Sequence, residues 1–176
     1  MQRYFVNKKE DNKFILSLDD SYHIVKVMRM KKGDLVEVVC CEVLYIAKII
    51  ELNDNVIVEI IETCDTYNEL DVKVTICQSL VKEAKMDLIL QKSTELGAYS
   101  FIPLKVKNSI VKGSDSDFLK KVTRWQRIVK EASEQSKRNI IPEVMNPKSI
   151  KEICSLDFDL KILCTVNELS TTFKNV

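Results

Sequence analysis

The stretch KKVTRWQRIVKEASEQSKRNIIP, residues 120–142, carries the pattern on which the predicted fold depends. Its apolar side chains recur at spacings of three and four residues, which predicts a helix over about residues 118–137 with a narrow stripe toward a core. The stripe consists of Val122, Trp125, Val129 and Ala132. The opposite face is charged and consists of Lys120, Arg124, Arg127, Glu131, Glu134 and Arg138. Such a face is either solvated and held by weak ion pairs, or it binds a polyanion.

Around this helix, the second half of the chain alternates strand and helix patterns. Apolar runs predict strands at residues 72–77, 101–104 and 160–164, and a helix over residues 83–96 ends at Gly97. This alternation favours a parallel sheet with helices on both faces. Because only a short polar segment follows the last run, we expect an incomplete α/β domain over residues 71–176.

The first part of the chain is rich in short β-branched runs, at residues 35–39, 45–50 and 56–61. They predict a small β-barrel over residues 1–70, joined to the second domain by a polar linker at residues 63–69. One short helix interrupts the strands. We expect Asp19, Asp20 or Ser21 to cap it, Ile24, Val27 and Met28 to face inward, and Lys26 and Arg29 to stay outside.

Composition narrows the class of protein. The chain has 176 residues, 45% of them hydrophobic and 30% charged, as in ordinary globular domains. No apolar run approaches the roughly 18 to 20 residues that span a bilayer, and the start lacks the apolar stretch of a signal peptide, so we expect a cytoplasmic protein. The six cysteines form no CxxC pair, and His23 is the single histidine. We therefore expect buried reduced thiols and no metal site.

Enzyme classes that need particular motifs are disfavoured. The chain has three glycines, Gly33, Gly97 and Gly113, which are too few and too far apart for a dinucleotide-binding turn or a P-loop. A Ser or Cys hydrolase mechanism would depend on His23, which lies in the β-rich part of the chain. Hydrolase chemistry is therefore a poor prediction.

Positive charge is local. Residues 101–140 carry ten Lys and Arg against four Asp and Glu, whereas the whole chain has a net charge of +1. A first basic patch comprises His23, Lys26, Arg29, Lys31 and Lys32, which suit RNA phosphates and bases, and we assign Arg3 to it as well. Lys105, Lys107 and Lys112 follow the strand at 101–104, where α/β sheets bind ligands. The alternatives are a solvated surface and a flexible basic loop.

Four sequence blocks, in this order, resemble a known family. They are MQRYF at residues 1–5, HIVKVMRMKKGD at 23–34, QKSTELG at 91–97, and RWQRI leading to EQSKRN within 124–139. The chain is similar to the bacterial 16S ribosomal RNA uridine-N3 methyltransferases of the SPOUT class, which have a PUA-like N-terminal barrel. It departs from them at residues 40–45, where relatives often have a glycine-containing hairpin. It also lacks their Gly-Pro-Glu-Gly-Gly-type loop, which helps to tie the knot around S-adenosylmethionine.

The resemblance implies a reaction and its participants. S-adenosylmethionine would methylate N3 of a uridine in 16S ribosomal RNA or the small ribosomal subunit, in a homodimer whose cofactor site is expected beyond Val176. Residues 1–176 alone should then bind the cofactor weakly. Glu134, Arg138 and Asn139 would be catalytic, since N3 must lose a proton and its charge must be held; alternatively, Glu134 and Arg138 only pair to end the helix. Arg124 and Arg127 would join the RNA contacts.

Two other functional classes remain open at this point. The chain could be a non-catalytic RNA-binding or ribosome-associated module, or, less in keeping with the motifs, a metabolic α/β enzyme with an accessory barrel.

Overall fold

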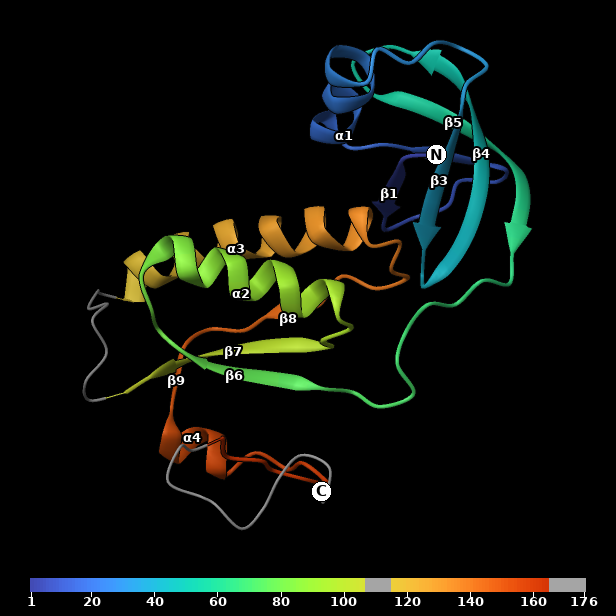
Figure 1. Cartoon of the computed structure of the whole chain (residues 1–176). Helices are drawn as coiled ribbons and strands as arrows, with labels where there is room; N and C mark the ends of the chain where they lie inside the picture. Colours follow the sequence, from blue (N-terminus) through green and yellow to red (C-terminus); the bar gives the residue numbers. More distant parts are fainter. Residues whose placement is uncertain (107–114, 165–176) are drawn as a thin grey trace.

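The computed structural model describes residues 1–106 and 115–164, and its first part is a curled five-stranded sheet in the order β1-β3-β4-β5-β2 (Figure 1). β1 runs parallel to β3, and the other neighbours are antiparallel. The strands are β1 (Arg3–Val6), β2 (Lys13–Ile15), β3 (Leu35–Cys40), β4 (Val43–Leu52) and β5 (Val56–Cys64). The predicted small barrel is confirmed in the form of a curled sheet, or half-barrel.

Alternate side chains of these strands fill one hydrophobic core, as the two-residue period of a strand requires. The buried members include Tyr4, Phe14, Val36, Val38, Ala47, Ile49, Val56 and Val58. Each fully buried aliphatic side chain contributes about 1.5–3 kcal/mol relative to exposure. At the β3–β4 hairpin, Cys41 and Glu42 have φ of 50° and 67°, the backbone signs of a type I′ turn made without glycine.

The predicted short helix is present but is wound differently. Ser17 caps α1 (Leu18–Tyr22) by accepting from the Asp20 N–H, and the chain continues as a π-helical turn, η1 (His23–Val27). Ile24 is buried as expected, but the inward placement of Val27 and Met28 is wrong, since they are 57% and 45% exposed. The wider π turn rotates them outward.

The second sheet is parallel, as predicted, with β7 (Ser100–Lys105) at its centre. Its neighbours are β6 (Thr75–Ser79), β8 (Glu143–Val144) and β9 (Lys148–Ser149). Figure 1 shows α2 (Glu83–Glu95) and α3 (Asp115–Gln135) together on one side of this sheet, and α4 (Ile150–Cys154) on the other. Among the described helices, then, the two long ones share a face.

The apolar stripe of α3 is confirmed. Trp125, Val129 and Ala132 are at most 4% exposed. Trp125 and Val129 pack with side chains of α2 and β7, and the partly buried Val122 packs against the same cluster. This stripe packs the helix against the sheet, and it therefore fixes the orientation of the charged side chains on the opposite face of α3.

Three expectations about the chain are corrected. Residues 160–164 form no strand, and Leu163 is 86% exposed; the strands that follow α3 in the described sheet are β8 and β9. The linker at residues 63–69 begins inside β5, and its last residue, Glu69, is buried in an ion pair. All six thiols are free, but only Cys40 is buried.

No helix within the described residues is long and apolar enough to cross a membrane.

Candidate nucleic-acid interface

The first basic patch lies at the end of η1 and in the turn that follows it. Lys26, Arg29, Lys31 and Lys32 are all exposed, and none of the four side chains has an acidic partner among the described residues. The Lys31 N–H donates to the Asp34 carboxylate at 2.7 Å, which closes the turn. The backbone therefore holds four unpaired cations on one end of the barrel, where phosphate groups can reach them.

His23 and its neighbours complete this surface. The imidazole is half-buried, with Nδ1 3.0 Å from the Tyr4 hydroxyl, so one edge of the ring is anchored in the barrel. Tyr22 is 65% exposed beside it, together with Val27 and Met28. An exposed aromatic ring among cations suits stacking on an unpaired base. Sequence patterning missed Tyr22; the available signal was an aromatic residue directly before the basic block.

Arg3 does not belong to this patch. Its residue is 2% exposed, its Nε donates to the Glu37 carboxylate at 2.8 Å, and its Nη1 donates to the Arg138 carbonyl at 2.9 Å. The guanidinium is thus enclosed between the barrel and the second domain. The assignment of Arg3 to the RNA surface is corrected, because strand β1 places it on the inner side.

Arg138 is likewise enclosed. Helix α3 ends at Gln135, Lys137 turns the chain back with φ of 60°, and Arg138 is 3% exposed. Its Nε donates to Glu69 at 3.0 Å, its Nη2 also pairs with Glu69, and its Nη1 donates to the Ala98 carbonyl at 2.6 Å. These internal acceptors occupy all three nitrogens of the guanidinium.

Glu69 and Asn139 continue the same network. The Glu69 side chain is 5% exposed and also accepts the backbone N–H groups of Asn139 at 2.7 Å and Ile140 at 3.1 Å. The Asn139 amide donates to the Glu42 carbonyl at 2.8 Å and to the Thr66 carbonyl at 3.0 Å. In this conformation neither Arg138 nor Asn139 presents its side chain to a substrate, so the geometry does not support the catalytic roles predicted for them.

Glu134 lies in a second cluster, between α3 and α1. Lys130 Nζ is 2.5 Å from Asp20 Oδ1 and 3.4 Å from Glu134 Oε1, so two carboxylates share one ammonium. Burial, reinforced by the charge of Asp20, raises the pKa of Glu134 to about 7. The alternative prediction, that Glu134 and Arg138 pair with each other, is wrong, because Glu134 pairs with Lys130 and Arg138 with Glu69.

The remaining predicted contacts lie along α3 and the end of β7. Lys105 is exposed, with its ammonium 4.9 Å from the centre of the Phe118 ring, whereas Lys107 and Lys112 lie outside the described residues. Arg124 pairs with Asp87, and Arg127 pairs with Glu131 at 3.0 Å. The charged face of α3 is therefore partly neutralised by its own ion pairs.

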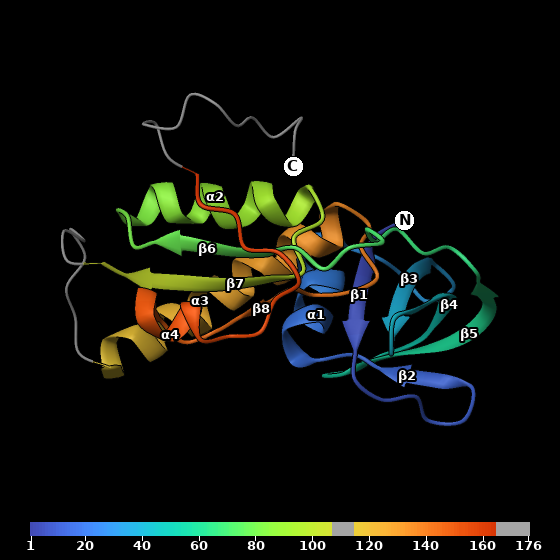
Figure 2. The ribbon, with the colours of Figure 1, turned by 90° about the horizontal axis from the view of Figure 1, so that it is seen from below.

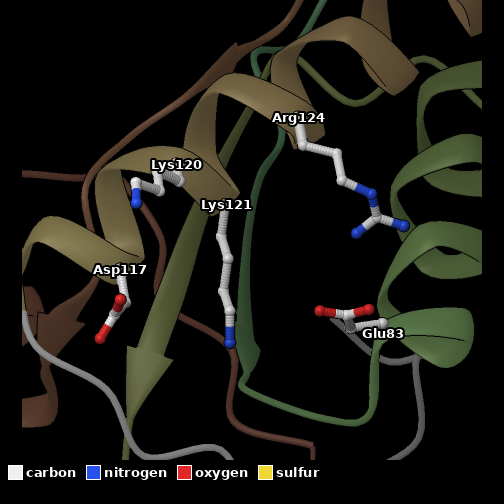
Figure 3. Close-up of a pocket in the computed structure, with 5 residues that line it drawn as sticks. All are labelled: Glu83, Asp117, Lys120, Lys121 and Arg124. Carbon is white, nitrogen blue, oxygen red and sulfur yellow. The ribbon is translucent and has the colours of Figure 1, made fainter.

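An open cleft of about 430 Å³ separates the starts of α2 and α3. It is lined by Glu83, Asp117, Lys120, Lys121 and Arg124. Figure 3 shows Lys121 and Arg124 pointing into the opening, with the Glu83 carboxylate facing them from α2. The lining is wholly charged and of mixed sign, which suits a polar surface contact better than an enclosed small molecule.

Comparisons with known proteins identify the family. Residues 68–175 match the RNA methyltransferase domain, and residues 9–61 match the RNA methyltransferase PUA domain. The chain belongs to the RNA methyltransferase family. Membership of an RNA methyltransferase family with a PUA domain is thereby confirmed, while 16S ribosomal RNA and uridine N3 stay predictions.

Two curated relatives of this RNA methyltransferase share one name. Ribosomal RNA small subunit methyltransferase E of Bacillus subtilis (strain 168) is 39% identical over 90% of this chain, which covers 66% of that protein. The enzyme of the same name from Mesomycoplasma hyopneumoniae (strain 232) is 32% identical over 93% of this chain and 70% of its own length. The chain thus spans about two thirds of the length of these relatives.

Two solved structures share the fold over most of the chain. A methyltransferase from Legionella pneumophila, in complex with the bound cofactor SAM, superposes with a TM-score of 0.91 at 25% identity, over 99% of this chain and 74% of that one. Ribosomal RNA small subunit methyltransferase E from Neisseria gonorrhoeae, bound to S-adenosyl methionine, gives a TM-score of 0.83 at 26% identity, over 90% and 67%.

Proposed function

We propose that this protein methylates N3 of a uridine in 16S ribosomal RNA with S-adenosylmethionine as the methyl donor. Residues 1–70 would form the RNA-binding domain, and residues 71–176 would form part of the methyltransferase domain. The observation that carries the proposal is the likeness of both domains, in one arrangement, to the S-adenosyl methionine-bound enzyme from Neisseria gonorrhoeae. The unpaired cations at the end of the barrel support it from the side of the substrate.

The described residues have a binding role in this reaction. Lys26, Arg29, Lys31 and Lys32 would neutralise RNA phosphates, and Tyr22 would stack on a base that has left the helix. Methylation at N3 also needs a group that accepts the N3 proton. Glu134 is a poor choice, because its carboxylate is largely buried and lies 3.4 Å from the Lys130 ammonium.

The cleft of Figure 3 has no group that selects for S-adenosylmethionine. The cofactor contains a sulfonium cation, whereas three cations, Lys120, Lys121 and Arg124, outnumber the carboxylates of Glu83 and Asp117 in the lining. We therefore assign no step of methyl transfer to that cleft. The role left to it under this proposal is an electrostatic contact with RNA.

Methyl transfer to ribosomal subunits tests the proposal directly. The protein, at the full length encoded by its gene, is incubated with labelled S-adenosylmethionine and small ribosomal subunits from a strain in which that gene is deleted. One labelled uridine is expected, located by mass spectrometry and by a stop of reverse transcription, since an N3 methyl group blocks the pairing edge. Absence of label from small-subunit RNA would refute the proposal.

A non-catalytic RNA-binding protein is the second candidate. The observation that favours it is the enclosure of Arg138 and Asn139, which removes two predicted catalytic groups from the surface. Tight binding to the small subunit without any methyl transfer would select this alternative. A homodimer and a cytoplasmic location are further proposals that rest on the resemblance, and sedimentation equilibrium and cell fractionation test them.

A further inference from the structure

A buried polar joint connects the barrel to the methyltransferase domain. The Arg138 guanidinium, after the end of α3, binds Glu69 in the connecting segment and the Thr94 and Ala98 carbonyls at the end of α2. The Arg138 carbonyl accepts Nη1 of Arg3 from strand β1 of the barrel. One residue thus touches the barrel, the connecting segment and the second domain.

We propose that Arg138 and Glu69 are positioning residues that fix the barrel relative to the methyltransferase domain and so determine which RNA nucleotide is presented for methylation. This inference rests on the proposed function. It assigns neither residue to the chemistry, because neither reaches the surface.

The connecting segment needs such a lock. After β5 ends at Cys64, the chain runs to β6 without regular structure, and a segment of this kind would ordinarily act as a hinge. Here the Glu69 carboxylate accepts from Arg138 and from the backbone N–H groups of Asn139 and Ile140. The Asn68 N–H also donates to the Asn139 side chain at 3.1 Å. The segment is therefore held at its centre.

Two flanking ion-pair contacts place the barrel on α3 in the same orientation. Lys137 Nζ is 3.1 Å from Glu37 on β3, and Lys130 bridges to Asp20 on α1. Figure 2 shows β1 and α1 on the side of the barrel that faces the second sheet and its helices. If the Arg138–Glu69 pair is removed, the connecting segment is no longer held, and the two flanking ion pairs alone have to keep the barrel in this orientation.

Orientation matters because the basic patch and the site of methyl transfer lie on different domains under the proposed function. RNA held by Lys26 and Arg29 reaches the second domain only at the distance and angle that the joint sets. A misplacement of about 1 Å can cost about 100-fold in rate. A loosened joint should consequently weaken the choice of nucleotide without affecting the cofactor.

Residual dipolar couplings of the 176-residue chain test the joint without any RNA. The wild-type chain should fit a single alignment tensor for both domains, whereas Glu69→Gln, which keeps the shape but removes the charge, should need two. The control is Glu131→Gln, which removes the carboxylate from the exposed pair with Arg127. If Glu69→Gln does not fold, Arg138→Lys carries the same measurement. A single unchanged tensor in the folded variant overturns the proposal.

Kinetics of the protein at the full length encoded by its gene test the consequence. In Glu69→Gln the KM for small-subunit RNA should rise by about 10-fold or more, the KM for S-adenosylmethionine should stay within about twofold of wild type, and methyl groups should appear on neighbouring nucleotides. Equal rises in both KM values with an unchanged target would indicate a merely structural role and overturn the inference. A wild-type protein without methyl transfer refutes the proposed function instead, and the dipolar couplings still decide the joint.

Discussion

Arginine and lysine side chains are used in opposite ways at the two ends of the barrel. At the patch, Lys26, Arg29 and Lys32 are exposed and have no acidic partner among the described residues. At the joint, Arg3 and Arg138 are at most 3% exposed, and each binds a carboxylate. The first arrangement leaves charge available to a ligand, whereas the second uses all of it to hold the protein together.

The difference shows that residue type and spacing do not determine the role of a cation. Arg29 follows η1 with φ of 52°, and the backbone turns its side chain to solvent. Arg138 follows a similar positive φ at Lys137, but there the turn directs the chain back between the domains. The neighbouring element, not the local turn, decides whether the charge is buried.

Arg138→Ala tests the joint with the largest expected effect. Removing the guanidinium leaves the Glu69 carboxylate buried without its cation, so the free energy of unfolding should fall by about 3–5 kcal/mol. Urea denaturation of the 176-residue chain measures this. The control is Arg127→Ala, whose exposed pair with Glu131 should change stability by no more than about 0.5 kcal/mol. A loss below about 1 kcal/mol for Arg138→Ala would return the residue to the class of surface ion pairs.

The pH dependence of stability tests the cluster of Glu134, Lys130 and Asp20 between α3 and α1. Its pKa is raised from 4.5 to about 7, so the folded state holds the proton more tightly than the unfolded state. Its contribution is therefore fully present below pH 4.5 and is lost as the pH rises to about 7. We expect Glu134→Gln to be more stable than wild type at pH 8, by on the order of 1–3 kcal/mol, with the difference vanishing toward pH 4.5.

Thermal denaturation of the two proteins across this range measures the difference, and other carboxylates cancel because both share them. A constant difference between Glu134→Gln and wild type from pH 4.5 to pH 8 would contradict the raised pKa.

Patterning predicted the parts of the fold that depend on periodicity. The stripe of Trp125 and Val129 follows from the helical repeat, and the β-branched runs follow from the two-residue repeat of strands. The shortest strands could not be predicted from periodicity. Strands β8 and β9, which pair with β7, have two residues each and are too short for any period, whereas residues 160–164 were predicted to form a strand and form none.

The candidate site was predictable only on its exposed side. Lys26 and Arg29 were expected outside and lie there. The burial of Arg3 and Arg138 depends on partners 34 and 69 residues away, and a local pattern does not contain such pairings. The π turn at His23 has no recognisable signature either, so the exposure of Val27 and Met28 followed from backbone geometry alone.

Alanine substitutions at Gly97, beside the joint, and at Gly33, beside the patch, compare the two regions at nearly equal backbone φ. Their φ values are 98° and 99°, so alanine should cost about 1–2 kcal/mol from strain at either position. An added Cβ at Gly97 would lie 2.8 Å from the Leu70 side chain, whereas at Gly33 it would meet nothing within 4 Å. Because Leu70 can move, the excess loss for Gly97→Ala should be only about 0.5–1.5 kcal/mol.

Chemical denaturation of the two glycine variants side by side measures the excess. Equal losses would show that Leu70 does not press on Gly97 and that the connecting segment is free at this point. The Gly97→Ala, Leu70→Ala double variant should recover the excess if the contact is its cause.

Arg29→Ala should have the smallest effect on stability and a clear effect on RNA binding. The side chain is exposed, so the free energy of unfolding should stay within about 0.5 kcal/mol of wild type. If the guanidinium neutralises one phosphate of single-stranded RNA, its loss should reduce the magnitude of the slope of log K against log salt by about 0.7, with affinity falling similarly for unrelated sequences. Fluorescence anisotropy at several salt concentrations measures both. An unchanged affinity and slope would make the patch an ordinary solvated surface. The cations without acidic partners would then lose their proposed role, because a guanidinium that binds phosphate must contribute to the salt dependence.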